Sequence, residues 1–445
     1  MSFIDYLRQK RDELADKLSD DSKDVHSDVL DEVEKGFEGI REDLSDTIAK
    51  IQACALENAD RIFALLRKIK PIVVFRDFAL VTRFDDVQEV LSHDNVFQTL
   101  YPEKLEAVGG VPEGTLGQPN NPGHQRDVAN MSVAFRREDI PDRIVPWIRQ
   151  HAEQAVAASN GRLDVVSGLT RYVPPRWIGQ YIGIPGPSPE QLADWADSIF
   201  RYIFTDLDND PAIAGPSLES AKEFRQYIDG VMAERKQNRG QHDDVLERFL
   251  AMQDIDLPGM FDARIRATLM IMVYGTVTLS AKAPAQAIDE LLRRPKELAA
   301  AQEAARAGNT ERVAKYVWEA LRFSAVNPGL FRTATEDYIV AKGNMRATKI
   351  PKGTRVFAAL ESAMLDEHEL DDPTEFRIDR PAYQFMHFGH GLHECFGRYV
   401  SYQQVPILVQ EVLKQKNLRR APGADGELEI RDRVFPVKMV VEFDT

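Results

Sequence analysis

The sequence predicts a mainly helical fold with small β-sheets, in the α+β class. Most of residues 125–325 lacks strand alternation, and helix-forming stretches such as DDVLERFLAMQ and ERVAKYVWEALRF are separated by proline and glycine turns. Short β-branched and aromatic runs follow Pro71 and recur between about 330 and 360. Hydrophobic residues make up 43% of the 445 residues, which is enough for a sizeable core and excludes disordered or collagen-like chains.

Charge and targeting signals exclude several classes of protein. The net charge of −15 does not suit a binder of nucleic acid or of anionic membranes, because both require a concentrated basic surface. The N-terminus MSFIDYLRQKRDEL has no apolar signal region, and two cysteines allow at most one disulfide. The uncharged apolar stretch between Arg266 and Lys282 has 15 residues, short of the ~20 of a membrane span. We therefore expect a cytoplasmic protein without a membrane span.

The chain divides at the sequence level into an acidic extension, residues 1–60, and a larger catalytic domain, residues 61–445. The extension holds 17 acidic and 8 basic residues. Its apolar residues recur at helical spacing and predict an amphipathic helix. They are Val33, Phe37, Ile40, Leu44, Ile48 and Ile51. We expect this stripe to pack on the protein's own body, with docking of a partner as the alternative, and we expect Cys54 to be an inert apolar residue.

The elements of the larger domain follow in order along the chain. The runs PIVVF and FALVTRF, separated by Arg76-Asp77, predict a hairpin or two paired strands. Residues 101–122 are rich in glycine, proline and asparagine and predict a long loop, a candidate pocket lid. YIV and KIPKGTRVFAAL predict a second small sheet, and a final helix is expected after Cys395.

Cys395 lies in a glycine-rich turn just before that final helix. The segment FMHFGHGLHECFGRYV places Gly389, Gly391 and Gly397 around it. At a helix start, backbone N–H groups and the positive end of the helix dipole stabilise a thiolate. Glycines also let the backbone come close to a flat ligand. These are the requirements of a thiolate that serves as the axial ligand of haem.

The segment resembles the haem-binding signature of the cytochrome P-450 family, F-x-x-G-x-x-x-C-x-G. Phe388, Gly391, Cys395 and Gly397 fill its defining positions, and the resemblance extends from about Lys70 to the C-terminus. It implies a triangular helical body around a buried haem b, whose iron Cys395 would bind as the axial ligand. It also implies an oxidoreductase that acts on a lipophilic small molecule.

The family's E-x-x-R signature appears as Glu319 and Arg322, whose i, i+3 spacing puts both charges on one helix face. The resemblance gives this pair a structural role. The family's P-x-R-F element reads PTEF here, so that Glu375 stands where the family has arginine. Arg377 or Arg380 could take over from nearby.

The resemblance also assigns residues to the haem propionates. Arg332, in FRTATEDYIV, and His393 match two of these positions. A guanidinium and a ring N–H both suit carboxylates. In GHQRD, His124 and Arg126 resemble the start of another propionate-binding helix, although Val128 stands where the family has a second basic residue.

The stretch RATLMIMVYGTVTLSAKAPAQAIDELL resembles the long helix over the haem, with its pattern A-G-x-(D/E)-T. Tyr274, Gly275, Thr276, Val277 and Thr278 fill those positions. The resemblance implies catalytic roles for Gly275, which opens space, and for Thr276 and Thr278, whose hydroxyls can hold dioxygen or water. The acid that helps protonate dioxygen is replaced by Val277, and Tyr274 stands where alanine is usual.

Three functions are compatible with the sequence. The protein could be a monooxygenase that takes electrons from NAD(P)H through a separate redox partner. The missing acid slightly favours a second function, in which the protein acts on a fatty-acid-derived substrate and uses a lipid hydroperoxide formed by a separate dioxygenase, because a peroxide needs less protonation. HECFGR and KNLRRAPGADGELE are similar to the haem-thiolate domain of fungal fatty-acid diol synthases, which isomerise such hydroperoxides. The third function is a haem protein without catalysis.

Overall fold

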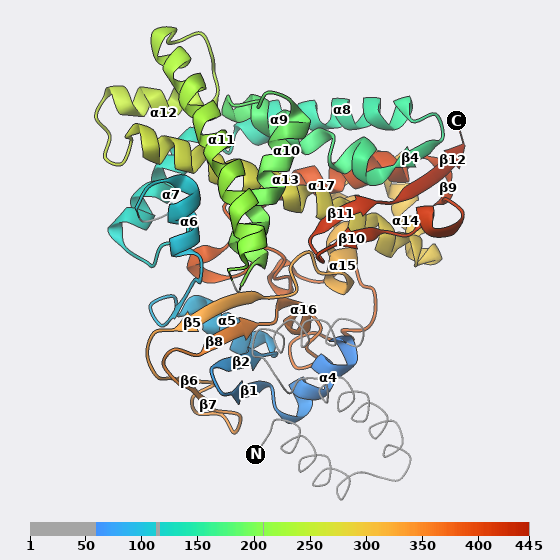
Figure 1. Ribbon diagram of the computed structural model, residues 1–445. Coiled ribbons are helices and arrows are strands. Elements are labelled where there is room, and N and C mark those ends of the chain that lie inside the picture. The colour runs from blue at the N-terminus through green and yellow to red at the C-terminus, as the bar shows by residue number, and fades with distance from the viewer. Residues whose placement is uncertain (1–58, 113–115, 208, 445) are drawn as a thin grey trace, which may run out of the picture. The chain divides into compact units, whose positions relative to one another are not determined.

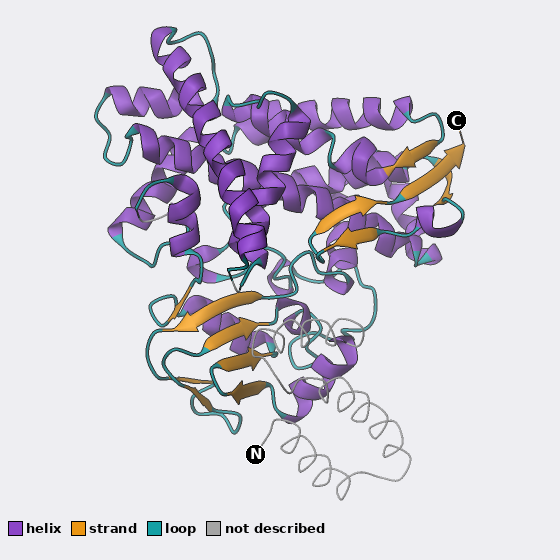
Figure 2. Ribbon diagram, in the orientation of Figure 1, coloured by secondary structure: helices purple, strands orange, loops and turns teal. Residues whose placement is uncertain are grey.

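The computed structural model describes residues 59–112, 116–207 and 209–444, which fall into two units (Figure 1). The smaller unit comprises the described residues up to 97 together with 328–374, and the larger comprises 98–327 and 375–444. Helices dominate the larger unit (Figure 2). The stripe predicted between Val33 and Ile51, and Cys54, lie outside the described residues. No described helix is long and apolar enough to cross a membrane.

The smaller unit begins with the predicted hairpin. Strands β1 (Ile72–Phe75) and β2 (Phe78–Val81) pair antiparallel, with Phe75 opposite Phe78 across the Arg76-Asp77 turn. Arg76 has φ 53°, in the left-handed region that two-residue hairpin turns require. The side chains of Ile72, Ala79 and Val81 are fully buried. The predicted hairpin is therefore confirmed.

The predicted second sheet at 330–360 is partly wrong. Strand β8 (Arg355–Ala358) pairs parallel with β2 and antiparallel with β5 (Leu330–Ala334), so both join the first sheet, in the order β1-β2-β8-β5-β3. A separate sheet contains β6 (Tyr338–Val340) and β7 (Thr348–Ile350). Strand propensity finds the segments, but pairing between segments far apart in the chain is decided by packing. The remaining elements of this sheet and unit are α4 (Ala59–Ile69), α5 (Phe84–Ser92), β3 (Phe97–Gln98) and α16 (Leu360–Ala363).

The larger unit is built around one long helix, α13, against which α6, α9, α10, α11, α15 and α17 pack. Most of α13 is buried, and its apolar residues belong to the main core. The α-helices of this unit are α6 (Pro102–Gly109), α7 (Pro122–Ala134), α8 (Val145–Ala158), α9 (Val173–Ile182), α10 (Pro189–Phe200), α11 (Pro211–Gln237), α12 (Val245–Asp254), α13 (Asp262–Leu292), α14 (Pro295–Arg306), α15 (Thr310–Phe323) and α17 (Arg398–Leu413). The mainly helical prediction for residues 125–325 is confirmed.

Short turns and two small sheets complete the larger unit. Strands β4 (Arg162–Asp164), β12 (Val440–Asp444) and β9 (Lys416–Arg420) form one antiparallel sheet, and β10 (Glu429–Arg431) pairs with β11 (Phe435–Lys438). The π-helical turns are η1 (Ile140–Ile144), η2 (Val166–Thr170) and η3 (Arg201–Thr205), and the 3₁₀ turns are η4 (Ala382–Gln384), η5 (Gly391–His393) and η6 (Gly423–Gly426).

The predicted loop at 101–122 is wrong over its first half, which forms α6. Pro102 stands in the first turn, where its missing N–H costs nothing, and Gly110 ends the helix with φ 68°. Leu105 and Val108, three residues apart, bury one face of α6. This short helix packs against α13, and burial of one face stabilises a helix that would be too short to form alone.

Candidate functional site

The cysteine loop has the local geometry that its glycines require. Gly389 and Gly391 both have φ 76°, a left-handed conformation that side-chain-bearing residues rarely adopt. The Cys395 backbone N–H donates to the Phe388 carbonyl at 2.9 Å and closes the loop. Gly397 is the N-cap of α17, which begins at Arg398. Cys395 therefore lies just before the helix, as predicted.

The Cys395 side chain is free and solvent-accessible. Desolvation by the surrounding protein nevertheless raises the pKa of its thiol, although the Gly397 backbone N–H and the Arg398 guanidinium act in the opposite direction. A thiol in this state is neutral by itself, and a bound metal cation would remove its proton. The chemistry of the sulfur donor and the accessible position thus both fit a haem iron.

Aromatic side chains pack against one another around this loop. Phe388 makes edge-to-face contacts with Trp318, at 5.6 Å between ring centroids, and with Tyr402, at 4.8 Å. His387 Nε2 donates to the Trp318 carbonyl at 2.9 Å, and burial lowers the pKa of the His387 imidazole to about 4. The sequence did not indicate that His387 is buried and bonded to Trp318. Only the folded structure distinguishes it from the other histidines of this loop.

Two of the predicted propionate residues lie side by side. The rings of His124, on α7, and His393, in η5, are 5.4 Å apart in an edge-to-face arrangement. The Asn121 side chain caps α7 by accepting from the His124 backbone N–H, and His393 Nδ1 donates to the Leu116 carbonyl. The structure thus brings together two imidazoles from segments about 270 residues apart, as a haem carboxylate would require.

The two predicted arginines have other partners in the structure. Arg126 donates two hydrogen bonds to Asp127, and its guanidinium lies against Gly259. Arg332 belongs to the smaller unit, where it is buried on β5 and donates to the Phe331 carbonyl. Their roles toward haem remain predictions from the resemblance.

The E-x-x-R pair is an ion pair with no exposed side-chain surface. Arg322 Nη2 lies 2.7 Å from Glu319 Oε1, and Arg380 Nε reaches the same oxygen at 3.2 Å. The Arg377 backbone N–H also donates to this oxygen, at 2.9 Å. Arg380 thus supplies the second guanidinium, while Glu375 contributes its backbone carbonyl as an acceptor for Arg322 and Arg380.

Helix α13 is buried over most of its length, but a few residues near its middle are not buried. Within residues 267–289, the residues that are not buried are Ile271, Gly275, Thr276 and Leu279. At about 100° per residue, Ile271, Gly275 and Leu279 lie along one face. A Cβ added at Gly275 would meet no atom within 4 Å. This accessible face of α13 includes Gly275, the residue beside which the resemblance places the cofactor.

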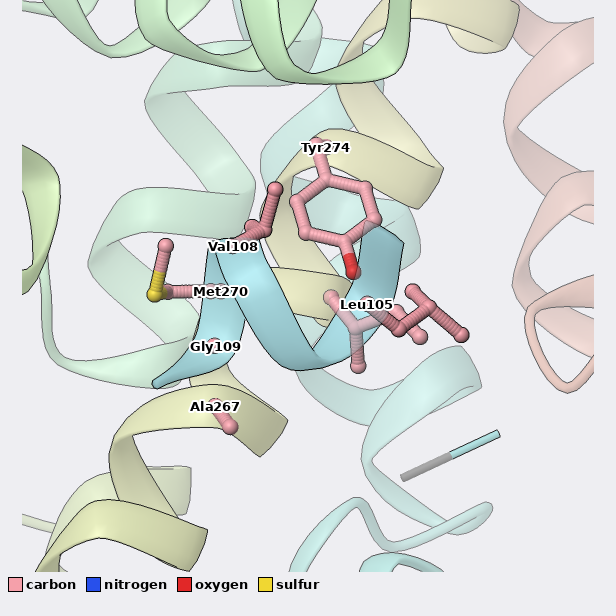
Figure 3. Close-up of a pocket in the computed structure, with 7 residues that line it drawn as sticks. Leu105, Val108, Gly109, Ala267, Met270 and Tyr274 are labelled. Atoms are coloured by element: carbon pink, nitrogen blue, oxygen red, sulfur yellow. The ribbon is translucent and has the colours of Figure 1, made fainter. Parts of the chain in front are cut away.

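Thr278 and Tyr274 have different surroundings from the accessible face. Thr278 is 1% exposed, and its hydroxyl donates to the Asp197 carboxylate on α10 at 2.7 Å. Tyr274 is buried and lines a small pocket with Leu105, Met270 and others, its hydroxyl directed toward Leu105 (Figure 3). Burial raises the pKa of the Tyr274 phenol. Asp197 is a residue that sequence reasoning missed, since 81 positions separate it from Thr278.

Comparisons with known proteins agree with this geometry. A model of the cytochrome P450 family matches residues 198–431. The chain is 25% identical over 403 residues to pulcherriminic acid synthase of Bacillus subtilis, covering 86% of this chain and 94% of that protein. It is 26% identical over 338 residues to erythromycin C-12 hydroxylase of Saccharopolyspora erythraea (75% and 80% covered). It is 24% identical over 380 residues to steroid C26-monooxygenase of Mycolicibacterium smegmatis (83% and 89% covered).

Solved structures show the same fold. CalO2 superimposes with a TM-score of 0.74 at 20% identity, covering 87% of this chain and 96% of that one. P450BioI, in complex with an acyl carrier protein ligated to hexadec-9Z-enoic acid, also gives 0.74 at 20% identity, covering 88% and 99%. The curated relatives named above are bacterial, and the similarity to fungal diol synthases remains a prediction.

Proposed function

Since the chain belongs to the cytochrome P450 family of haem-thiolate oxidoreductases, we propose that it is an O₂- and NAD(P)H-dependent monooxygenase for a lipophilic small molecule. A separate redox partner would supply its electrons. The observation that carries the proposal is the accessible face at Gly275 on α13, which leaves room beside an otherwise buried helix of the unit that holds Cys395. The α+β fold and haem b as the family's cofactor agree with the sequence predictions.

The residues of the larger unit have distinct roles toward haem in this proposal. Bound haem b supplies the iron chemistry that activates O₂ for insertion of one oxygen atom into the substrate. Cys395 would hold the haem iron through its thiolate, which would donate electron density to the iron. Gly391 lets the backbone approach the ring, and His124 and His393 offer N–H donors to a propionate. Arg126 and Arg332 remain predicted contacts of the propionates.

The lipophilic substrate class is proposed from the names of the relatives, and the side chains between α6 and α13 are apolar as well. Leu105, Val108, Met270 and Ile271 present apolar surface, and Tyr274 contributes the phenol (Figure 3). The names of the relatives refer to erythromycin and to a steroid, which are bulky lipophilic molecules. We propose a substrate of this general kind.

The decisive experiment identifies the source of the oxygen atom in the product. Haem-loaded protein with a surrogate ferredoxin and its reductase should convert a lipophilic probe, testosterone or palmitic acid, only when NAD(P)H is present. With ¹⁸O₂ the product should carry one ¹⁸O atom. Cys395→Ser should abolish both turnover and the thiolate type of CO-difference spectrum. An unchanged CO-bound Soret position in Cys395→Ser would contradict the ligand assignment.

A hydroperoxide-dependent isomerase or peroxygenase is the second candidate, favoured by Val277. This buried apolar residue stands where the family has an acid on α13, so this position provides no general acid. Faster turnover with linoleic acid hydroperoxide than with O₂ and reductase would support this candidate, and Val277→Asp would then bring at most a modest gain in O₂-dependent turnover. Absence of turnover with either oxygen source would leave the haem protein without catalysis.

A further inference from the structure

We infer that Asp197 on α10 is the carboxylate partner of Thr278, completing from a neighbouring helix the acid–hydroxyl pair that α13 lacks at Val277. The inference rests on the proposed monooxygenase function and deepens it. Asp197 acts through the Thr278 hydroxyl and is therefore a positioning residue. Its role is to hold that hydroxyl and to renew its proton.

The contact between the two side chains is short and protected. Thr278 Oγ1 donates to Asp197 Oδ1 at 2.7 Å, within the normal range for a hydroxyl and a carboxylate. Thr278 is 1% exposed, whereas the Asp197 side chain is 18% exposed. The carboxylate thus connects a buried hydroxyl to water. Helices α10 and α13 pack against each other, which keeps the two residues close together.

By helical spacing, the buried Thr278 lies at the edge of the accessible face of α13. It follows Gly275 by three residues, which turns its side chain about 60° from the direction of Gly275. It follows Ile271 by seven residues, or two turns, and so shares the side of Ile271. A hydroxyl at this edge can serve a molecule on the accessible face while its proton is held by Asp197.

Arg171 fixes the orientation of Asp197. Its guanidinium forms an ion pair with Asp197 Oδ2, the oxygen that does not bind Thr278. Arg171 also lies 3.8 Å from Asp194, whose side chain is 72% exposed. Because one oxygen is held by the guanidinium, the other is directed at Thr278. Arg171 itself stays protonated and carries no proton across.

The proton transfer needs only water as the source. Asp197 takes one proton from solvent at its accessible edge and becomes a neutral carboxyl. As the Thr278 hydroxyl rotates and releases its own proton toward the accessible face, Asp197 donates its proton to Thr278 Oγ1. Each group then has its starting number of protons, and one proton has moved inward. Val277 can make no such transfer.

The test compares two neutral substitutions on α10. Asp197→Asn keeps the shape and an oxygen that can accept from Thr278, but its amide cannot take up a proton from water and pass it on. Asp194→Asn removes the same charge one turn away, near the same arginine, and leaves the hydrogen bond between Asp197 and Thr278 in place. Both variants are assayed as haem-loaded protein with the surrogate redox pair and testosterone or palmitic acid, measuring product and H₂O₂ per NAD(P)H, and separately with added H₂O₂ in place of NAD(P)H.

We expect Asp197→Asn to lower product per NAD(P)H by about tenfold to a hundredfold, with H₂O₂ rising in compensation. Turnover driven by added H₂O₂ should stay within about twofold of the wild type, because the peroxide brings its own protons. Asp194→Asn should match the wild type in both assays. Unchanged coupling in Asp197→Asn, or an equal loss in the peroxide-driven assay, would overturn the inference, the second outcome indicating a purely structural contact.

A spectroscopic readout tests the contact without turnover. Infrared spectra of the resting protein labelled with ¹³C-aspartate should show a carboxylate band that shifts in Thr278→Val and is missing in Asp197→Asn. In the Asp197→Asn background, Thr278→Val should cause no shift. A wild type that turns over with peroxide but never with O₂ and reductase would overturn the proposed function itself, whereas intact wild-type coupling with no Thr278-dependent band would overturn only the role of Asp197.

Discussion

In the larger unit, the buried carboxylate of Glu319 accepts hydrogen bonds from two guanidinium groups and a backbone N–H. Its side chain has no exposed surface, so every one of these donors replaces a lost interaction with water. The Arg380 side chain is 2% exposed and fills the place of the arginine that PTEF lacks. The buried charge therefore depends on both guanidinium groups.

Arg380→Ala should lower the free energy of unfolding by ~1–3 kcal/mol, because it removes one donor from a buried carboxylate that keeps Arg322. Urea unfolding followed by circular dichroism measures the change. Arg377→Ala is the matched control: its side chain pairs with the exposed Asp379, and its contact with Glu319 uses the backbone. The control should stay within ~0.5 kcal/mol of the wild type. Equal effects of the two substitutions would contradict the role of Arg380.

His387 makes stability depend on pH. Its imidazole is neutral in the folded protein, with a pKa of about 4 against 6.5 in an unfolded chain, because burial disfavours the charged form. Between these values the unfolded chain binds more protons, so the free energy of unfolding should fall as the pH drops from about 6.5 to about 4. His387→Gln should flatten this part of the profile in urea titrations. His242→Gln, at an exposed position, should leave the slope unchanged, and a persistent slope in His387→Gln would contradict the assignment.

At the scale of elements, α13 combines a structural and a functional requirement. Its buried length holds the core of the larger unit together, yet Gly275 interrupts that surface with a residue that weakens a helix. A glycine inside a helix costs ~0.5–1 kcal/mol relative to alanine. No neighbouring atom would obstruct a side chain at Gly275, so packing within the protein does not explain the glycine.

Gly275→Ala should therefore raise the free energy of unfolding by ~0.5–1 kcal/mol while it weakens binding of a probe such as testosterone, because its methyl group would occupy the accessible face. Unfolding curves and optical titrations measure the two effects. Gly230→Ala on α11 is the matched control, since a Cβ there also meets no atom within 4 Å. It should bring the same stability without a change in affinity. A gain in affinity for Gly275→Ala would contradict the functional role of this face.

At the scale of the whole molecule, the acidic N-terminal extension remains a prediction. The sequence boundary at residue 60 falls inside α4, which starts at Ala59 and buries Phe63 and Leu66 in the smaller unit. Arg67 on the same helix donates to Ser362. A deletion that leaves α4 complete therefore ends at residue 58.

Deletion of residues 1–58 should leave haem binding intact, because it removes 16 acidic and 8 basic residues but no proposed haem contact. The CO-difference spectrum of the purified truncated protein measures this. Deletion of residues 1–69 is the control, and it should destabilise the protein because it removes the buried residues of α4. A 1–58 deletion variant that incorporates no haem would show that the extension belongs to the haem-binding body.

Features that depend on neighbouring residues could be predicted from the sequence alone. The loop around Cys395, the start of α17, the Glu319–Arg322 pair and the β1–β2 hairpin all follow from glycine conformations, helix spacing and turn geometry within about a dozen residues. These local rules were also sufficient for the family resemblance, whose signatures are short. They did not show α6, whose helix depends on burial against α13.

The contacts between residues far apart in the chain became known only from the tertiary structure. It paired β8 with β2, chose Arg380 over Arg377 for Glu319, and placed Asp197 on the Thr278 hydroxyl. Each of these contacts joins positions 61 to 277 residues apart in the chain. Hydrogen-bonding capacity is a property of a single residue, but the choice among many equivalent partners depends on how the helices and strands pack, and that is settled by the burial of the whole core.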